Sequence, residues 1–222
     1  MSKSILTFLL INCCFLFSQN TKYVLDAEGK ISDMHTLYKK YPDNSMEFRI
    51  VKDSGKVLQI TAPKYSTYKV DYNTIKTEIS HITNQSYNDS TTFVFMYFYK
   101  DDDSTSLTRN NKFNEESDFK SFFIEMKKSV YKKYPNVISF LLFEKGITFP
   151  NYDKTPSKKE VFFSDKEGFF KNNLFKKSII SGSHCVIKPN GETVVLNGEN
   201  RLDYMAEHLK AENWILFFSN KE

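Results

Sequence analysis

Two apolar runs in the middle of the chain predict the centre of a β-sheet. Residues 92–99 and 137–143 are apolar at nearly every position, whereas a strand with one face in water alternates apolar and polar residues. A strand without that alternation is covered on both faces, as in a parallel sheet between two layers of helices. The segment between the runs repeats apolar residues at helical spacing, at Phe119, Phe122, Phe123, Met126 and Val130. The pattern therefore predicts a strand–helix–strand unit in an α/β domain.

Capping residues place the ends of the predicted helices. Asp71 predicts the start of a helix over residues 72–84, and Asn114 the start of the middle helix. The apolar face of the first of these helices is formed by Tyr72, Ile75, Ile79 and Ile82. Asn200 predicts a last helix, with Asp203 at the position whose side chain can reach back to the cap.

The C-terminal part of the chain also contains a hairpin signal. Residues 184–187 and 193–196 flank Asn190-Gly191, a frequent two-residue hairpin turn. The apolar tail 214–218 is expected to pack as an edge strand or a final turn. Together these elements predict that residues 65–222 form the main domain.

The segment before this domain has a different character. Residues 47–51 and 57–61 flank a turn that contains Gly55, and a short helix is expected over residues 32–41. We therefore expect residues 20–64 to form a β-rich N-terminal extension of the main domain.

The first eighteen residues have the layout of a secretory signal peptide. Lys3 precedes an apolar run over residues 5–17, and the small residue Ser18 follows it. The run is shorter than the roughly 20 apolar residues that span a bilayer. We expect residues 1–18 to be removed and the protein to be periplasmic or secreted, with no stable membrane span after cleavage. The alternative is an uncleaved N-terminal anchor.

Composition and charge exclude several classes of protein. Of the 222 residues, 40% are hydrophobic and only 7 are Gly and 6 Pro, so the chain can bury a core and is not a disordered or collagen-like sequence. The net charge of +4 is too small to indicate a nucleic-acid partner. We expect no nucleic acid as partner, but an unidentified protein or small ligand.

The order of these elements resembles the thioredoxin fold. The segment from Cys185 to Val195 resembles the stretch before the final helix in exported bacterial thioredoxin-like proteins. The resemblance implies an α/β fold with a central mixed β-sheet flanked by helices. It also implies a Cys-x-x-Cys motif after the first long central strand and a cis-proline before the hairpin. Residues 101–113 contain no cysteine and residues 181–184 no proline, so the dithiol activity is not expected here.

Cys185 is the one cysteine outside the predicted signal peptide. One hypothesis makes it a catalytic redox thiol, with the neighbouring His184 as its activator. The other makes it a small buried apolar residue in a core strand, which we favour because neighbours on a strand point to opposite faces.

Asp101, Asp102 and Asp103 follow the first central strand, where ligand sites of open α/β sheets lie. Their oxygens are suited to Ca²⁺ or Mg²⁺, and the alternative is a solvated acidic loop. The sequence contains no glycine-rich phosphate loop, and we expect no cofactor. The favoured prediction is an exported thioredoxin-like binding or structural module, and the alternative is a single-cysteine redox enzyme.

Overall fold

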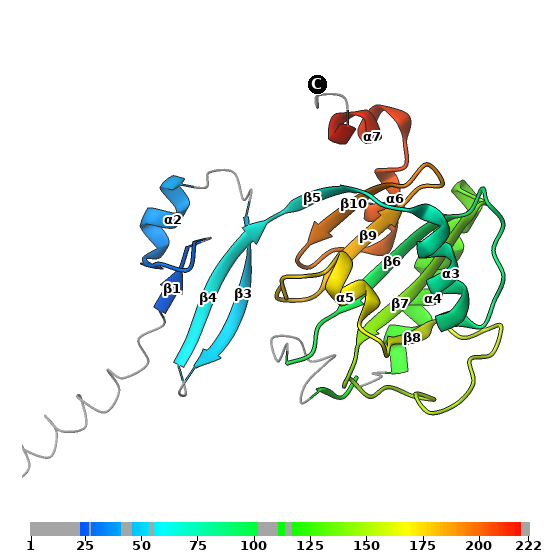
Figure 1. Ribbon diagram of the computed structural model, residues 1–222, viewed down its shortest axis with the longest axis horizontal. Helices are drawn as coiled ribbons and strands as arrows, with labels where there is room; N and C mark the ends of the chain where they lie inside the picture. Colours follow the sequence, from blue (N-terminus) through cyan, green and yellow to red (C-terminus); the bar gives the residue numbers. More distant parts are fainter. Residues whose placement is uncertain are drawn as a thin grey trace, which may run out of the picture.

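The computed structural model describes residues 23–26, 28–40, 46–53, 56–101, 111–113 and 117–218. Its main part is a six-stranded mixed sheet with the strand order β5-β10-β9-β6-β7-β8 (Figure 1). The strands are β5 (Tyr65–Lys69), β6 (Thr92–Phe98), β7 (Val137–Glu144), β8 (Phe162–Asp165), β9 (Ser183–Ile187) and β10 (Glu192–Asn197). The helices of this part are α3 (Tyr72–Thr83), α4 (Ser117–Lys133), α5 (Phe169–Asn173), α6 (Leu202–Glu207) and α7 (Ala211–Phe218).

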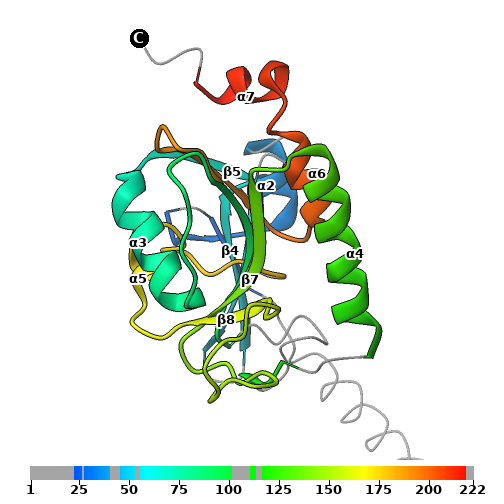
Figure 2. The same cartoon turned by 90° about the vertical axis from the view of Figure 1, so that its right-hand side faces the viewer.

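The two apolar runs form the central strands, as predicted. β6 pairs with β7 in parallel and with β9 in antiparallel orientation, so it has a strand on each side. Helices α3 and α5 cover one face of the sheet, and α4 and α6 cover the other (Figure 2). Two apolar clusters fill the spaces between the sheet and these helix layers. The non-alternating pattern of β6 and β7 follows from this double coverage.

The α/β class with a central mixed sheet flanked by helices is thus confirmed. The chain runs from β6 through α4 to β7, and then through a link with β8 and α5 to the β9–β10 hairpin and α6. This is the element order that the resemblance to the thioredoxin fold implies. The link contributes β8, which pairs with β7 in parallel and ends the sheet on that side.

Helix α3 begins where the sequence predicts. The side chain of Asp71 accepts a hydrogen bond from the backbone N–H of Thr74 at 2.8 Å, which satisfies one of the free donors of the first turn. The buried residues on its inner face are Tyr72, Ile75, Ile79 and Thr83. The helix ends at Asn84, which is in the left-handed conformation with φ of 53°.

Two details of the other helices differ from the prediction. Phe122 of α4 is 45% exposed, and the guanidinium of Arg201 lies 5.2 Å from the centre of its ring. Phe122 therefore lies outside the buried stripe, where a cation covers part of its ring. The predicted cap Asn114 lies outside the described residues.

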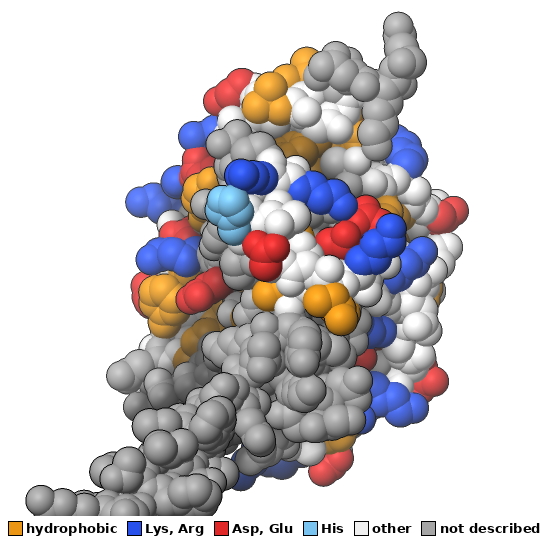
Figure 3. All heavy atoms as spheres, turned by 90° about the vertical axis from the view of Figure 1, so that its left-hand side faces the viewer, with side chains coloured by type: hydrophobic (Ala, Val, Ile, Leu, Met, Phe, Trp, Pro, Cys, Tyr) orange, Lys and Arg blue, Asp and Glu red, His pale blue; other side chains and the backbone are white. Residues whose placement is uncertain are grey.

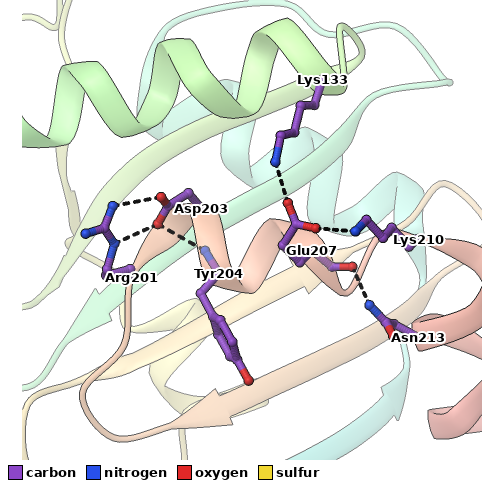
Figure 4. Close-up of polar contacts among 7 residues, drawn as sticks. All are labelled: Lys133, Arg201, Asp203, Tyr204, Glu207, Lys210 and Asn213. Atoms are coloured by element: carbon purple, nitrogen blue, oxygen red, sulfur yellow. Dashed lines mark hydrogen bonds and ion pairs between the residues drawn. The ribbon is translucent and has the colours of Figure 1, made fainter.

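The cap of α6 is the second difference. The residue before the helix is Arg201, and no side chain caps the helix there. Instead of reaching back to Asn200, Asp203 accepts two hydrogen bonds from the guanidinium of Arg201, at 2.8 and 3.0 Å (Figure 4). The charged guanidinium offers two strong donors, which the carboxylate takes in place of the backbone N–H of Asn200. The carboxylate also accepts a hydrogen bond from the backbone N–H of Tyr204 at 3.1 Å.

An ion-pair network joins α6 to its neighbours. Glu207 accepts hydrogen bonds from Lys133 of α4 and pairs with Lys210, and its backbone oxygen accepts from Asn213 of α7 (Figure 4). The hydrogen bond from Lys133 is the main cause that lowers the pKa of Glu207 to about 2. Residues 214–218, which were expected to form an edge strand or a final turn, instead belong to the helix α7.

The N-terminal segment forms a second sheet with the order β2-β1-β4-β3. Its elements are β1 (Tyr23–Leu25), β2 (Ile31–Ser32), α2 (Met34–Lys40), β3 (Met46–Asp53) and β4 (Lys56–Pro63). β3 and β4 form the predicted antiparallel hairpin, and β1 adds to β4 in parallel.

On the face that Figure 3 shows, basic and acidic side chains are interspersed. Among the described residues, no helix is long and apolar enough to cross a membrane.

Candidate functional site

Cys185 lies in β9 with its side chain in the core. It is fully buried in the apolar cluster under α3 and α5, in register with Phe95 of β6 and Val195 of β10. Burial raises the pKa of its thiol well above the usual value. Thiol chemistry requires an accessible thiolate, and this thiol is neutral at pH 7 and closed off from solvent.

His184 faces the opposite side of the sheet. It is 1% exposed and stands in register with Met96 and Leu196, which belong to the cluster under α4 and α6. Within the described part of the chain, neither ring nitrogen makes a hydrogen bond of good geometry. Burial lowers the pKa of the imidazole to about 4, although the backbone of Asn200 opposes part of this shift. The structure therefore does not bring the imidazole and the thiol of Cys185 together.

The turn before β9 occupies the place where the resemblance implies a cis-proline. The described residues contain no cis peptide bond, and Ser181 and Gly182 are both left-handed, with φ of 66° and 83°. A Cβ on Gly182 would lie 2.6 Å from the backbone oxygen of Tyr97. The turn thus packs directly against the end of β6, and glycine is required for this close approach.

The acidic segment after β6 is described only at its start. The backbone N–H of Asp101 donates to the side chain of Asn111 at 2.6 Å, and Asn111 donates back to the Asp101 carboxylate at 2.8 Å. Asp101 therefore helps to close the base of the loop. Asp102 and Asp103 lie outside the described residues, so the hypothesis of a cation site stays a prediction. Among the residues that are described, no three His, Cys, Asp or Glu side chains are grouped so as to hold a metal ion.

A buried polar network lies at the carboxyl ends of β6 and β8. The carboxylate of Asp165 is fully buried and accepts hydrogen bonds from the Tyr97 hydroxyl at 3.1 Å and from the backbone N–H groups of Phe170 and Lys171 at 3.3 and 2.9 Å. Burial, followed by the negative charge of Asp165, raises the pKa of Tyr97 strongly. This tyrosine is therefore a hydrogen-bond donor at all physiological pH values.

The network continues toward β9 and β10. The hydroxyl of Tyr99 is 2.9 Å from that of Ser183, which in turn donates to Asn197 at 2.9 Å. The ammonium of Lys171 lies 4.8 Å from the centre of the Tyr99 ring. Because these buried groups satisfy one another, the network fixes the positions of the strand ends and of α5 and leaves few bonds for a ligand.

A pocket of about 230 Å³ lies beside the edge strand β8, and we call it the β8 pocket. It is formed by α3, by the segment 149–156 after β7, and by residues 160–167 in and around β8. α3 packs against β8 at this place. The inner wall is apolar, with contributions from Ile82, Phe149, Phe162 and Phe163.

The other lining residues give the β8 pocket polar and charged groups. The charged side chains are Glu78, Glu160, Glu167, Lys154 and Lys166, and His81 of α3 also lines the pocket. One oxygen of Glu160 accepts from the backbone N–H groups of Val161 and Phe162, at 2.9 and 3.2 Å. A concave site with an apolar wall and a few polar groups is the usual form of a small-molecule site.

Neither the polar network nor the β8 pocket was predicted from the sequence. Their members lie far apart along the chain, at residues 78–82, 97–99 and 149–167, and the fold brings them together. The one local signal is the polar pair Ser164-Asp165 directly after the apolar run 161–163, at the end of a strand.

Comparisons with solved structures give distant likenesses of fold, among them the following two. No protein-family model matches the chain, and no curated protein matches it. The structure of MTB dsbF in its mixed oxidized and reduced forms is similar with a TM-score of 0.31 and 12% identity, over 55% of this chain and 81% of that one. The N-terminal domain of PilB from N. meningitidis, in its reduced form, gives 0.37 and 10%, over 69% of this chain and 99% of that domain. Likenesses at this level say nothing about activity.

Proposed function

We propose that the chain is an exported thioredoxin-like domain that binds a ligand or partner and does not catalyse thiol–disulfide exchange. The observation that carries this proposal is the complete burial of Cys185. Its thiol has a raised pKa, and His184 points to the other face of the sheet. The alternative, a single-cysteine redox enzyme, requires a thiolate that substrates can reach.

The test is the reactivity of Cys185 with a chromogenic disulfide reagent. The comparison is between the wild-type protein and the Cys185→Ala variant, because any reaction of Cys13 or Cys14 then cancels in the difference. In the native state we expect no difference between the two proteins from pH 5 to pH 9. In denaturant we expect the wild type to release one more equivalent of chromophore.

A fast native reaction of Cys185 would reverse this conclusion. If the difference between the proteins appears within seconds and titrates below the usual thiol pKa of about 8.5, the single-cysteine redox enzyme is the better assignment. Slow native reaction at the rate of unfolding would agree with the proposal, since the thiol is then reached only in the unfolded chain.

The proposal of export rests on Lys3 and the apolar run 5–17. We expect the protein recovered outside the cytoplasm of its producing cell to lack about 18 residues at its N-terminus, as measured by intact-mass spectrometry. Recovery of the full-length mass in the membrane fraction would instead support the uncleaved anchor.

A further inference from the structure

The N-terminal sheet and the main sheet are joined at one point of the chain. β4 ends at Pro63 and β5 begins at Tyr65, so Lys64 is the single residue between a strand of each sheet. The two sheets share no strand pairing in the described parts of the chain. Figure 1 shows β4 leading into β5 at this junction, with one sheet on either side of it. Contacts that fix the backbone at Pro63 and Lys64 therefore fix how the N-terminal sheet is attached.

Asn197 holds both residues of the junction. Its backbone N–H donates to the carbonyl oxygen of Lys64 at 2.8 Å, and its side-chain amide donates to that of Pro63 at 2.6 Å. Asn197 is the last residue of β10 and is 9% exposed. The residue after it is held as well, because the backbone N–H of Gly198 donates to the backbone oxygen of Gly182 at 3.0 Å. The junction is thus bonded to the end of the main sheet.

The bond to Pro63 is the last link of a buried series of hydrogen bonds. The Ser183 hydroxyl donates its one hydrogen to the amide oxygen of Asn197 at 2.9 Å, so the Tyr99 hydroxyl, 2.9 Å away, is the donor to Ser183. Tyr99 and Ser183 are each 1% exposed and closed off from solvent. Every bond points toward the junction, and bonds aligned in this way polarise and strengthen one another. The series joins Tyr99, directly after β6, to the junction.

We propose that this series, from Tyr99 through Ser183 and Asn197 to Pro63, is a latch that holds the N-terminal sheet in one orientation. When the latch opens, the junction at Lys64 becomes a hinge, because a hinge requires only a few residues whose backbone angles can change. The latch crosses β9 and β10, so a change at the end of β6 alters the attachment of the N-terminal sheet. This inference goes beyond the proposed function and does not depend on a ligand.

Trypsin cleavage of the full-length protein after Lys64 measures how often the junction opens. The protease requires the carbonyl of Lys64 to leave Asn197, so the cleavage rate follows the population of the open junction. Mass spectrometry at early times identifies the product that begins at Tyr65. Cleavage after Lys127, in the middle of α4, reports on unfolding of the main domain in the same sample.

Asn197→Asp opens the latch at its last link. The carboxylate keeps the acceptor for Ser183 but has no N–H to donate to Pro63. We expect cleavage after Lys64 to become about tenfold faster relative to cleavage after Lys127, as for the loss of one net hydrogen bond. In ¹⁵N relaxation measurements we expect the N-terminal sheet of this variant to tumble faster than the main sheet, whereas both share one correlation time in the wild type.

Tyr99→Phe removes the first donor of the latch without touching the junction. We expect cleavage after Lys64 to rise about two- to fivefold relative to cleavage after Lys127. Tyr72→Phe is the matched control, because the Tyr72 hydroxyl donates to the backbone oxygen of Thr91, outside the latch. It removes one buried tyrosine bond of the same kind and is expected to leave the ratio of the two cleavage rates unchanged.

The proposal is overturned if Asn197→Asp is cleaved after Lys64 at the wild-type rate. It is also overturned if the rates after Lys64 and Lys127 rise equally, because the substitution then only destabilises the whole protein. A shared correlation time of the two sheets in Asn197→Asp, or equal ratios for Tyr99→Phe and Tyr72→Phe, would contradict it as well. None of these results bears on the reactivity of Cys185, which tests the proposed function separately.

Discussion

Replacing Asp165 with alanine is expected to lower the free energy of unfolding by about 3–5 kcal/mol, because it leaves several buried donors without an acceptor. Those donors are the Tyr97 hydroxyl and the backbone N–H groups of Phe170 and Lys171. The site is fully buried, so water cannot replace the lost carboxylate without a rearrangement of the strand ends. Urea unfolding monitored by circular dichroism gives the change.

Because a loss of this size can prevent folding altogether, two milder variants keep the prediction testable. Asp165→Asn keeps one acceptor oxygen but turns an amide N–H₂ toward neighbouring donors, and we expect a loss of about 1–3 kcal/mol. Tyr97→Phe removes only one hydrogen-bond donor, and we expect it to lower the free energy of unfolding by about 1 kcal/mol. Asp153→Ala, at an exposed position, serves as the control and should stay within about 0.5 kcal/mol of the wild type. Equal stability of Asp165→Asn and the control would show that the network does not hold the strand ends.

The central sheet could be predicted because its signals are local. The uninterrupted apolar runs of β6 and β7, the capping side chain of Asp71 and the Asn190-Gly191 turn each determine structure within a few residues. These elements were found with nearly correct bounds. Each of them depends on neighbours in sequence, or on burial so complete that the exact partner does not matter.

The errors concern residues whose environment is set by a distant segment. Helical spacing places Phe122 on the buried stripe of α4, but Arg201 covers its ring at the surface. The same arginine takes both oxygens of Asp203, so the predicted contact with Asn200 does not form. In both cases a charged side chain from another part of the fold decides between two locally acceptable arrangements.

The candidate site could not be predicted for the same reason. Ser164 and Glu78 are unremarkable in the sequence, and only the packing of α3 against β8 places both at one pocket. The strongest chemical candidate in the sequence, Cys185 with His184, was instead divided between the two faces of the sheet by strand alternation.

His184 is expected to make the fold sensitive to mild acid. Burial holds the pKa of its imidazole at about 4 in the folded protein, against about 6.5 in the unfolded chain. Between these values the unfolded state binds a proton that the folded state does not, so the free energy of unfolding falls as the pH falls from about 6.5. At about 1.36 kcal/mol for each pKa unit, the full loss below pH 4 is about 3 kcal/mol.

The pH window identifies the group responsible. Carboxylates whose pKa is lowered by hydrogen bonds, such as Asp203 and Glu207, lose most of their stabilising contribution below about pH 4.5, because only there is more than half of each group protonated in the unfolded chain. His208 is half-buried, and burial lowers its pKa, so it adds a contribution of the same sign as that of His184. A slope between pH 4.5 and pH 6.5 therefore reports on these two histidines.

His184→Leu is expected to remove most of this slope and to stabilise the protein at pH 7 by about 1–3 kcal/mol, since two unpaired ring nitrogens leave the core and the apolar volume is kept. Urea unfolding at half-unit steps from pH 4.5 to pH 7.5 measures both effects. The exposed His35 provides the matched control, because His35→Gln should retain the wild-type slope. If His184→Leu keeps that slope as well, the imidazole must find a partner in solution and is not the neutral, unpaired group that burial implies. A destabilised His184→Leu protein at pH 7 would point the same way, because it would show that the imidazole makes a stabilising hydrogen bond, such as one with the backbone of Asn200.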